Sequence, residues 1–244
     1  MTIEALDTFP CMAACYLEKQ IEHARGILLL GAHPDARLVA RAMLEGFWQL
    51  SWASQDQDVR AHRWMTFAYV CDWRTIQHRE ARGDEVPANE RAVVAEGLAQ
   101  FGPQFLRRKP RAVPLANGTT MMDPYSSSWH GKSVGELARE AHDESEYVRA
   151  YALFSDRGHW DTAEAGRSLD LAHGKVLFSG ASPEGWASAL HIGFEYLFRT
   201  AMLVDTTLSR DRSGALEDVI QRYAARGREA GLNMTTPVEP PIGG

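Results

Sequence analysis

Cysteine is scarce in this chain, which has three in 244 residues. They form neither a paired framework nor a metal-ligand spacing, which argues against a disulfide-rich secreted domain and against a metal site built from cysteines. Cys11 and Cys15 are four residues apart and would share a helix face, whereas Cys71 lies far along the chain. We therefore predict that all three pack in the core, in a protein of the reducing cytoplasm.

Long apolar runs and an excess of positive charge are also missing. Every apolar stretch is broken by charge before the roughly 20 residues that a bilayer-spanning helix needs. The acidic segment Met1–Pro10 lacks the features of a signal peptide. The net charge of -6 gives no general attraction to nucleic acid or to anionic membranes. We expect no membrane partner, and an RNA partner only through a local basic patch.

Helical periodicity dominates the chain, and 45% hydrophobic residues are enough for one sizeable core. The pattern predicts an all-α fold, an antiparallel bundle of about six to eight helices with a long irregular mid-chain loop. We expect a single helical domain over residues 1–234 and a flexible tail over 235–244. Five of the expected helices span residues 10–30, 56–81, 88–106, 184–208 and 214–230. Two more are expected around Arg41 and from Ser133 onward. We also expect a loop over residues 107–128 and a short strand at 175–178. The buried side of the first helix should carry Ile21, Ala24, Ile27 and Leu28.

Two charges interrupt the apolar second helix, at Arg41 and Glu45. Residues four apart share a helix face, so the two charges join one stripe with Leu38, Trp48 and Trp52. No side of this helix is polar enough to face water, and we predict a buried ion pair. A buried pair usually contributes little to stability and is retained for specificity or for a site, so it marks a candidate functional position.

A second polar stripe follows at Tyr147, Tyr151, Ser155 and His159, which recur at four-residue steps. These side chains exchange hydrogen bonds, and histidine changes charge near neutral pH. We predict that this stripe faces the Arg41 and Glu45 pair across the bundle, with Arg63 or Tyr69 as the third-helix neighbour. The alternative is a tyrosine-lined helix interface with a satisfied core histidine.

The basic segment Arg107–Arg111 allows two interpretations, a solvated helix end favoured by the helix dipole or a contact for an anion or RNA. Shortly after it, Ser133 is a good N-cap, and Glu136 completes a capping box at the start of the next helix. Gly131-Lys132-Ser133 is only a fragment of a phosphate-binding loop, because the earlier glycine and the preceding strand are missing.

Three motifs occur in one order: Arg41-x-x-x-Glu45, Trp129-x-Gly-Lys-Ser-x-x-Glu-Leu-Ala, and Tyr147-x-x-x-Tyr-x-x-x-Ser-x-x-x-His159. With them the chain resembles a bacterial helical family known as domain of unknown function 5677, over about Ile21–Leu208. The resemblance implies a helical fold and a candidate site, and no reaction. If Arg41, Glu45, Tyr151 and His159 converge, their natural roles are an anion anchor, its orienting carboxylate, a hydroxyl donor and a titratable base.

Three functions follow as hypotheses. The first is a helical module that binds a small anionic or nucleotide-like ligand through Arg41, Glu45, Arg63, Tyr69 and Tyr147, with His159, Tyr151 and Ser155 as candidate catalytic groups. The second is a metal-independent endoribonuclease of a toxin or phage-defence system. It would resemble the HEPN proteins, which use an arginine with a histidine a few residues later, as in Arg167 and His173. The third is an interaction protein that forms a homodimer through an aromatic surface.

Metal and cofactor chemistry finds little support in the sequence. The Glu-x-x-His pairs of di-iron bundles and the His-Glu-x-x-His motif are both absent. The His142-Asp143-Glu144 run contains ligand residue types, but adjacent helical residues point in different directions. We expect no metal and no cofactor.

Overall fold

A computed structural model describes residues 8–151, 154, 169–170, 175–176, 183–209 and 211–229. The chain divides into two compact units, which we treat separately. Unit 1 comprises residues 1–55 and 134–244, and unit 2 comprises residues 56–133. The expected single domain over residues 1–234 stays a prediction.

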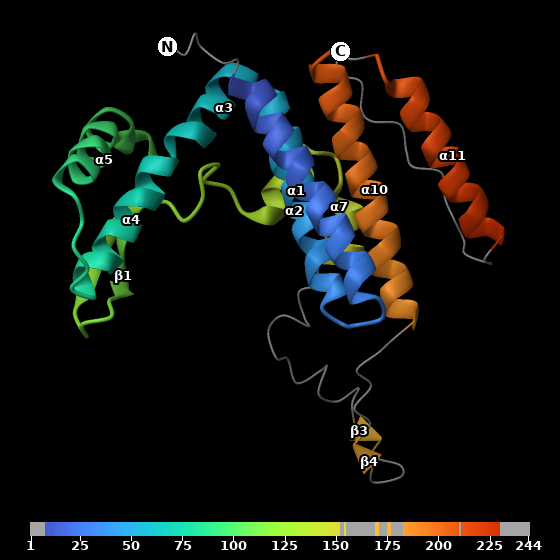
Figure 1. Ribbon diagram of the computed structural model, residues 1–244, viewed down its shortest axis with the longest axis horizontal. Coiled ribbons are helices and arrows are strands. Elements are labelled where there is room, and N and C mark those ends of the chain that lie inside the picture. Colours follow the sequence, from blue (N-terminus) through green and yellow to red (C-terminus); the bar gives the residue numbers. More distant parts are fainter. Residues whose placement is uncertain are drawn as a thin grey trace. The chain divides into compact units, whose positions relative to one another are not determined.

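Unit 1 is built around three long helices, α1 (Thr8–Leu30), α2 (Ala36–Ser54) and α10 (Pro183–Thr207), which lie side by side (Figure 1). A short turn joins α1 to α2, and Gly31 adopts there a φ of 55°, a conformation that favours glycine. The last helix, α11 (Ser213–Glu229), packs along α10, where the rings of Phe194 and Tyr223 stack. These helices agree with the predicted ones to within one or two residues at most ends.

Short elements complete unit 1. Helix α6 (Val134–Glu140) begins directly after Ser133, as predicted, and packs on α2. Helix α7 (Glu144–Glu146) then leads into a π-helical turn, η2 (Tyr147–Tyr151), a conformation that is frequent at functional sites. Strands β3 (Leu169–Asp170) and β4 (Lys175–Val176) pair in antiparallel fashion, which confirms the predicted strand at its two described residues.

The buried face of α1 differs from the predicted one. Ala13, Gln20 and Ile27, which are seven residues apart, point inward, whereas Ile21 and Leu28 are 38% and 61% exposed. The prediction for Ile21 and Leu28 was therefore wrong. The neighbouring helix sets which apolar stripe is covered: α10 approaches closely at Gly193, where an added Cβ would lie 2.5 Å from Cδ1 of Ile27.

The cysteine prediction was also wrong. Cys15 and Cys71 are exposed, and Cys11 is half-buried. In α1 the reason is again which face of the helix is buried. Met12 and Ala13 lie on the buried face, so Cys11 and Cys15 lie on faces that are more exposed to solvent.

Unit 2 contains three helices, a 3-10 turn and a hairpin. The predicted helix over 56–81 is divided into α3 (Gln57–Thr66) and α4 (Ala68–Ala81), with Phe67 between them. The next helix, α5 (Ala88–Phe101), ends before the predicted residue 106 and continues as the 3-10 turn η1 (Gly102–Phe105). The core between α4 and α5 consists of Ile76, Val86 and Val94, with Trp73 and Leu98 packed against it.

Residues 107–128, which the sequence predicted to be a loop, are mostly an antiparallel hairpin. Strand β1 (Leu106–Pro114) pairs with β2 (Thr120–Tyr125), with Pro114 opposite Thr120. The turn uses Gly118 at a φ of 81°, next to Asn117, whose Oδ1 accepts a hydrogen bond from the Thr119 N–H. The strand signal was absent because β1 is exposed along almost its whole length and has no apolar alternation.

The described part of the chain is predominantly helical, which confirms the predicted fold class. Within that part, no helix combines the length and the apolar content that crossing a bilayer requires.

Candidate functional site

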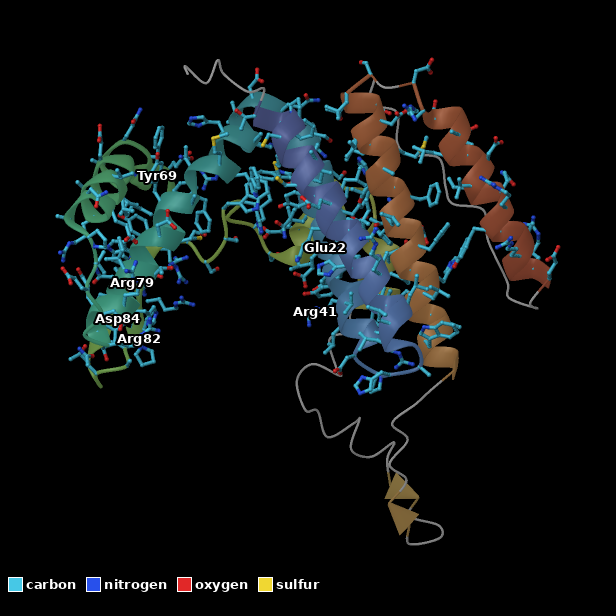
Figure 2. The ribbon with its side chains drawn as sticks, in the orientation of Figure 1. Glu22, Arg41, Tyr69, Arg79, Arg82 and Asp84 are labelled. Carbon is cyan, nitrogen blue, oxygen red and sulfur yellow. The ribbon has the colours of Figure 1, made fainter. Side chains whose placement is uncertain are left out.

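Arg41 and Glu45 meet Tyr151, as the two-stripe prediction required. Arg41 Nε lies 3.1 Å from Glu45 Oε1, and Arg41 Nη2 donates a hydrogen bond of 2.8 Å to the Tyr151 hydroxyl. The guanidinium carbon also lies 4.6 Å from the centre of the Tyr151 ring. Helix α2 and the turn η2 thus hold Arg41 from two directions, and Figure 2 labels its side chain on α2.

The ion pair is not buried, which corrects the prediction. The side chains of Arg41 and Glu45 are 24% and 30% exposed. Along the same stripe, Leu38 is 36% exposed while Trp48 is fully buried, so α2 passes from solvent into the core along this face. The charges sit at that transition, where both side chains are half-buried and partly accessible to water.

The π-helical turn orients the tyrosines. The rings of Tyr147 and Tyr151 stack with centroids 5.2 Å apart, and both lie near the indole of Trp48. Gly135 on α6 makes room for this stack, since a Cβ there would lie 3.2 Å from the Tyr147 ring. Burial and the Glu45 carboxylate raise the pKa of Tyr151, so its hydroxyl keeps its proton at neutral pH.

Asp143, just before α7, is the hub of a second, buried cluster that adjoins the first through Trp48. Its Oδ2 accepts hydrogen bonds from the Trp48 indole N–H at 2.6 Å, from the Tyr196 hydroxyl, and from Arg199 Nη1 at 3.1 Å. Asp143 is only 6% exposed. One carboxylate therefore ties α2, the start of α7 and α10 together, and so fixes the position of η2.

The stripe His191, Glu195 and Arg199 on α10 was missed by the sequence reasoning. These residues are four apart, and Glu195 lies 3.9 Å from both His191 Nε2 and Arg199 Nη1. The signal was available, because the four-residue rule that identified Arg41 and Glu45 applies equally to this apolar helix. The helix was instead interpreted from its apolar residues alone.

Burial shifts both titratable groups of that stripe toward their uncharged forms. It raises the pKa of Glu195, with partial opposition from Arg199, and it lowers the pKa of His191, to which Arg149 also contributes. Among the described residues, the buried Nδ1 of His191 has no hydrogen-bond partner. pKa shifts of this kind are found where a helix buries polar side chains for structural reasons, and they are also found at sites where side chains exchange protons with a substrate.

The charges around Asp143 largely compensate one another. Arg149 forms a two-bond contact with Glu146 at 2.8 to 2.9 Å, and Arg199 neutralises Asp143. The guanidinium of Arg199 also lies over the Phe47 ring at 4.4 Å. The cluster is thus suited to fixing helices in place, whereas Arg41 is the better candidate to receive a ligand.

The other predicted site residues lie elsewhere. Ser155, His159, Arg167 and His173 are outside the described residues, so the histidine base and the ribonuclease pair stay predictions. Arg63 and Tyr69 belong to unit 2, where Arg63 Nε donates to the Trp129 carbonyl at 2.6 Å and Tyr69 stacks on Phe101. Their proposed proximity to Arg41 also stays a prediction.

No ligand set for a metal emerges from the residues that can be described: no three of their His, Cys, Asp or Glu side chains group closely enough to hold an ion.

Comparison with family models decides the family. A model named Family of unknown function (DUF5677) matches residues 11–175, which is most of the chain. The chain belongs to DUF5677. The DUF5677 match includes α2, unit 2 and the Tyr147 turn, and it ends before α10, earlier than the expected limit at Leu208. Comparisons with curated proteins and with solved structures gave no match.

In unit 2, His130 lies in a positively charged environment. Burial, and secondarily the charge of Arg63, lower the pKa of His130 to about 4, from an ordinary value of 6.5. Its Nδ1 accepts a hydrogen bond from the Lys132 N–H at 3.1 Å. The imidazole is therefore neutral at physiological pH.

Acidification should consequently destabilise the protein through His130. The unfolded chain takes up a proton at His130 near pH 6.5, whereas the folded chain does so only near pH 4. The free energy of unfolding is therefore highest above pH 6.5 and falls as the pH drops from 6.5 to 4. We expect His130→Asn, which keeps an acceptor for Lys132, to reduce this fall by about 1 kcal/mol, allowing for partial solvent screening. Urea unfolding from pH 4 to 7 measures it. His33→Asn, at an exposed site, is the control, and equal slopes in both variants would contradict the assignment.

Proposed function

We propose that unit 1 binds a small anionic ligand at Arg41. The observation that supports this is that Arg41 is held in one orientation by Glu45 and Tyr151 while its side chain remains 24% exposed. A guanidinium has five N–H donors, and these two bonds use only Nε and one N–H of Nη2. Among the described residues, Nη1 has no hydrogen-bond partner, so the Nη1 and Nη2 edge can face a ligand.

A carboxylate or phosphate fits that edge, because two parallel N–H donors match two oxygens of either group. The guanidinium is already positioned, so binding costs little of its conformational freedom. Glu45 adds a restriction: it already balances the charge of Arg41, and its 30% exposed carboxylate is an acceptor. The site therefore favours a ligand that combines one anionic group with a hydrogen-bond donor, as hydroxy acids, amino acids and nucleotides do.

Arg41→Gln should abolish ligand binding while lowering the free energy of unfolding by about 1 kcal/mol or less, as expected for a solvent-accessible ion pair. A thermal-shift screen of organic acids, amino acids and mononucleotides provides the test. A ligand present at 100 times its Kd should stabilise the wild type by about 2.7 kcal/mol, and this gain should disappear in the variant.

Arg25→Gln, at an exposed position of α1, is the matched control and should keep the full ligand response. Tyr151→Phe removes only the hydroxyl that interacts with both Arg41 and Glu45, and it should weaken binding without abolishing it. If no compound in the screen stabilises the wild type and Arg41→Gln costs more than about 2 kcal/mol, the pair is a structural clamp and the proposal is wrong.

A further inference from the structure

Unit 2 contains a pocket of about 420 Å³ whose lining is polar and basic. Arg63, Arg107 and Lys132 contribute to it, together with the hydroxyl-bearing run Ser126–Ser128. The lining includes no carboxylate, although acidic residues outnumber basic ones in the chain as a whole. The pocket thus concentrates positive charge within an acidic protein.

Arg63 is fixed at this pocket. Its Nε donates to the Trp129 carbonyl at 2.6 Å, and its guanidinium lies over the Phe105 ring at 4.8 Å. Within the described residues, Arg63 has no carboxylate partner. Gly131, at a φ of 69°, brings the backbone close, since a Cβ there would be 3.8 Å from Arg63 Nη2. Burial lowers the pKa of Arg63, but the guanidinium stays charged at neutral pH.

The serine run is held by a separate arginine. Arg74 donates through Nη2 to the carbonyls of Tyr125 at 3.2 Å and Ser126 at 2.6 Å. Its Nε bonds to Asp123, which is fully buried, at 2.9 Å. The Ser126 N–H in turn donates to the Phe105 carbonyl at 2.7 Å. The loop that presents the hydroxyls is therefore fixed from within unit 2 and needs no ligand to order it.

We propose that this pocket binds the phosphate group of a small molecule. Phosphate offers several acceptor oxygens, which match guanidinium, ammonium and hydroxyl donors. A volume of about 420 Å³ exceeds a phosphate ion and lies in the range of small-molecule sites, so it leaves room for an organic part. The inference is independent of the proposed function, because it uses residues of unit 2 only.

Titration calorimetry of the full chain tests the proposal, at constant ionic strength set with sodium chloride. The probes are inorganic phosphate, ribose 5-phosphate, adenosine 5′-monophosphate and, as a phosphate-free control, adenosine. We expect saturable binding of at least one phosphate probe and none of adenosine. If a phosphate ester binds more tightly than inorganic phosphate, the ligand is a phosphorylated metabolite. If inorganic phosphate binds more tightly than the esters, the ligand is free phosphate.

Two pocket variants and one control locate the binding. Arg63→Gln should weaken phosphate binding by about tenfold or more, and Arg107→Gln by several-fold, as expected for lost charge-assisted hydrogen bonds. Arg91→Gln, at a 52% exposed side chain of unit 2, should bind as the wild type does. Arg63→Gln also loses the bond to Trp129, so circular dichroism checks its fold, and Arg107→Gln, at the exposed start of β1, keeps the test valid if Arg63→Gln unfolds.

Three results would overturn the proposal. The first is the absence of saturable binding by any phosphate probe, and the second is equal affinity in the pocket variants and Arg91→Gln. The third is preferential binding of a single-stranded RNA oligonucleotide with equal losses in Arg107→Gln, Arg108→Gln and Arg111→Gln, which would indicate a surface for nucleic acid instead of a phosphate pocket. A bound phosphate beside Arg63 should also raise the pKa of His130, which NMR titration can follow.

Discussion

Asp143→Ala should lower the free energy of unfolding by about 3–5 kcal/mol, the largest effect that we expect from a single substitution. The change removes the nearer carboxylate of the largely buried Arg199, leaving only Glu195 at 3.9 Å, and it removes the acceptor of the Trp48 indole and the Tyr196 hydroxyl. Each buried donor that is left unsatisfied adds its own desolvation penalty. Urea unfolding followed by circular dichroism measures the loss.

Asp143→Asn and Glu144→Ala are the matched variants. The amide keeps the shape and an acceptor oxygen but loses the charge that neutralises Arg199, so we expect a smaller loss than for alanine. Glu144 is 57% exposed and contacts Arg139 only at 3.9 Å, so Glu144→Ala should change stability by less than about 0.5 kcal/mol. A loss below about 1 kcal/mol for Asp143→Ala would contradict the role of Asp143 as the hub.

Gly97→Ala should lower the free energy of unfolding by about 2–3 kcal/mol, although alanine is the better helix former by about 1 kcal/mol. An added Cβ on α5 would lie 2.3 Å from Cδ1 of Tyr69, inside contact distance. The Tyr69 Cγ atom is also only 2.5 Å from the added Cβ, so turning the ring about its own axis cannot relieve the clash, and the ring stacks on Phe101 at 5.9 Å with an angle of 10° between the planes. Thermal unfolding of the variant measures the effect.

Two further variants isolate the steric cause. Gly26→Ala, in α1, places its Cβ no closer than 3.9 Å to Val39, so it should leave stability unchanged or raise it by up to about 1 kcal/mol. Combining Gly97→Ala with Tyr69→Ala removes the clash and should cost less than the sum of the two single changes. Strict additivity of the two losses would exclude the Tyr69 contact as their cause.

The helices could be predicted because apolar periodicity is a local signal. It gave α1, α10 and α11 to within a few residues and located α2 around Arg41, since each buries a continuous apolar stripe. The hairpin was missed because β1 buries neither face, so it has no apolar alternation. Strand β1 is held instead by its pairing with β2, in which Arg111 lies opposite Asp123. Which stripe of α1 is covered depends on where α2 and α10 pack, and no local pattern contains that information.

The outer part of the site could be predicted for the same reason. Charges four apart in an apolar helix indicated Arg41 and Glu45, and tyrosines four apart indicated Tyr151. Their burial could not be predicted, because the sequence does not show where a helix leaves the core. Asp143 was weighed only as a metal ligand, since its partners Trp48, Tyr196 and Arg199 are 95, 53 and 56 residues away along the chain.

The two clusters of unit 1 form one arrangement. Asp143 fixes the start of α7 to α2 and α10, the adjoining π-helical turn then places Tyr151, and Tyr151 orients Arg41. The buried cluster supplies the rigidity, and in our proposal the half-exposed cluster supplies the donors for a ligand. This division explains why the charges with the most contacts are not the ones that we assign to binding.

The most direct test of Arg41 as a ligand anchor is NMR of the arginine Nε–Hε groups during titration with glycolate, and with acetate, at constant ionic strength. Arg41→Lys assigns the resonance by its disappearance. We predict a saturable shift at Arg41, tighter with glycolate, whose hydroxyl can donate to Glu45, than with acetate. A linear, unsaturable shift at Arg41 that matches the shift at the exposed Arg25 would contradict the account.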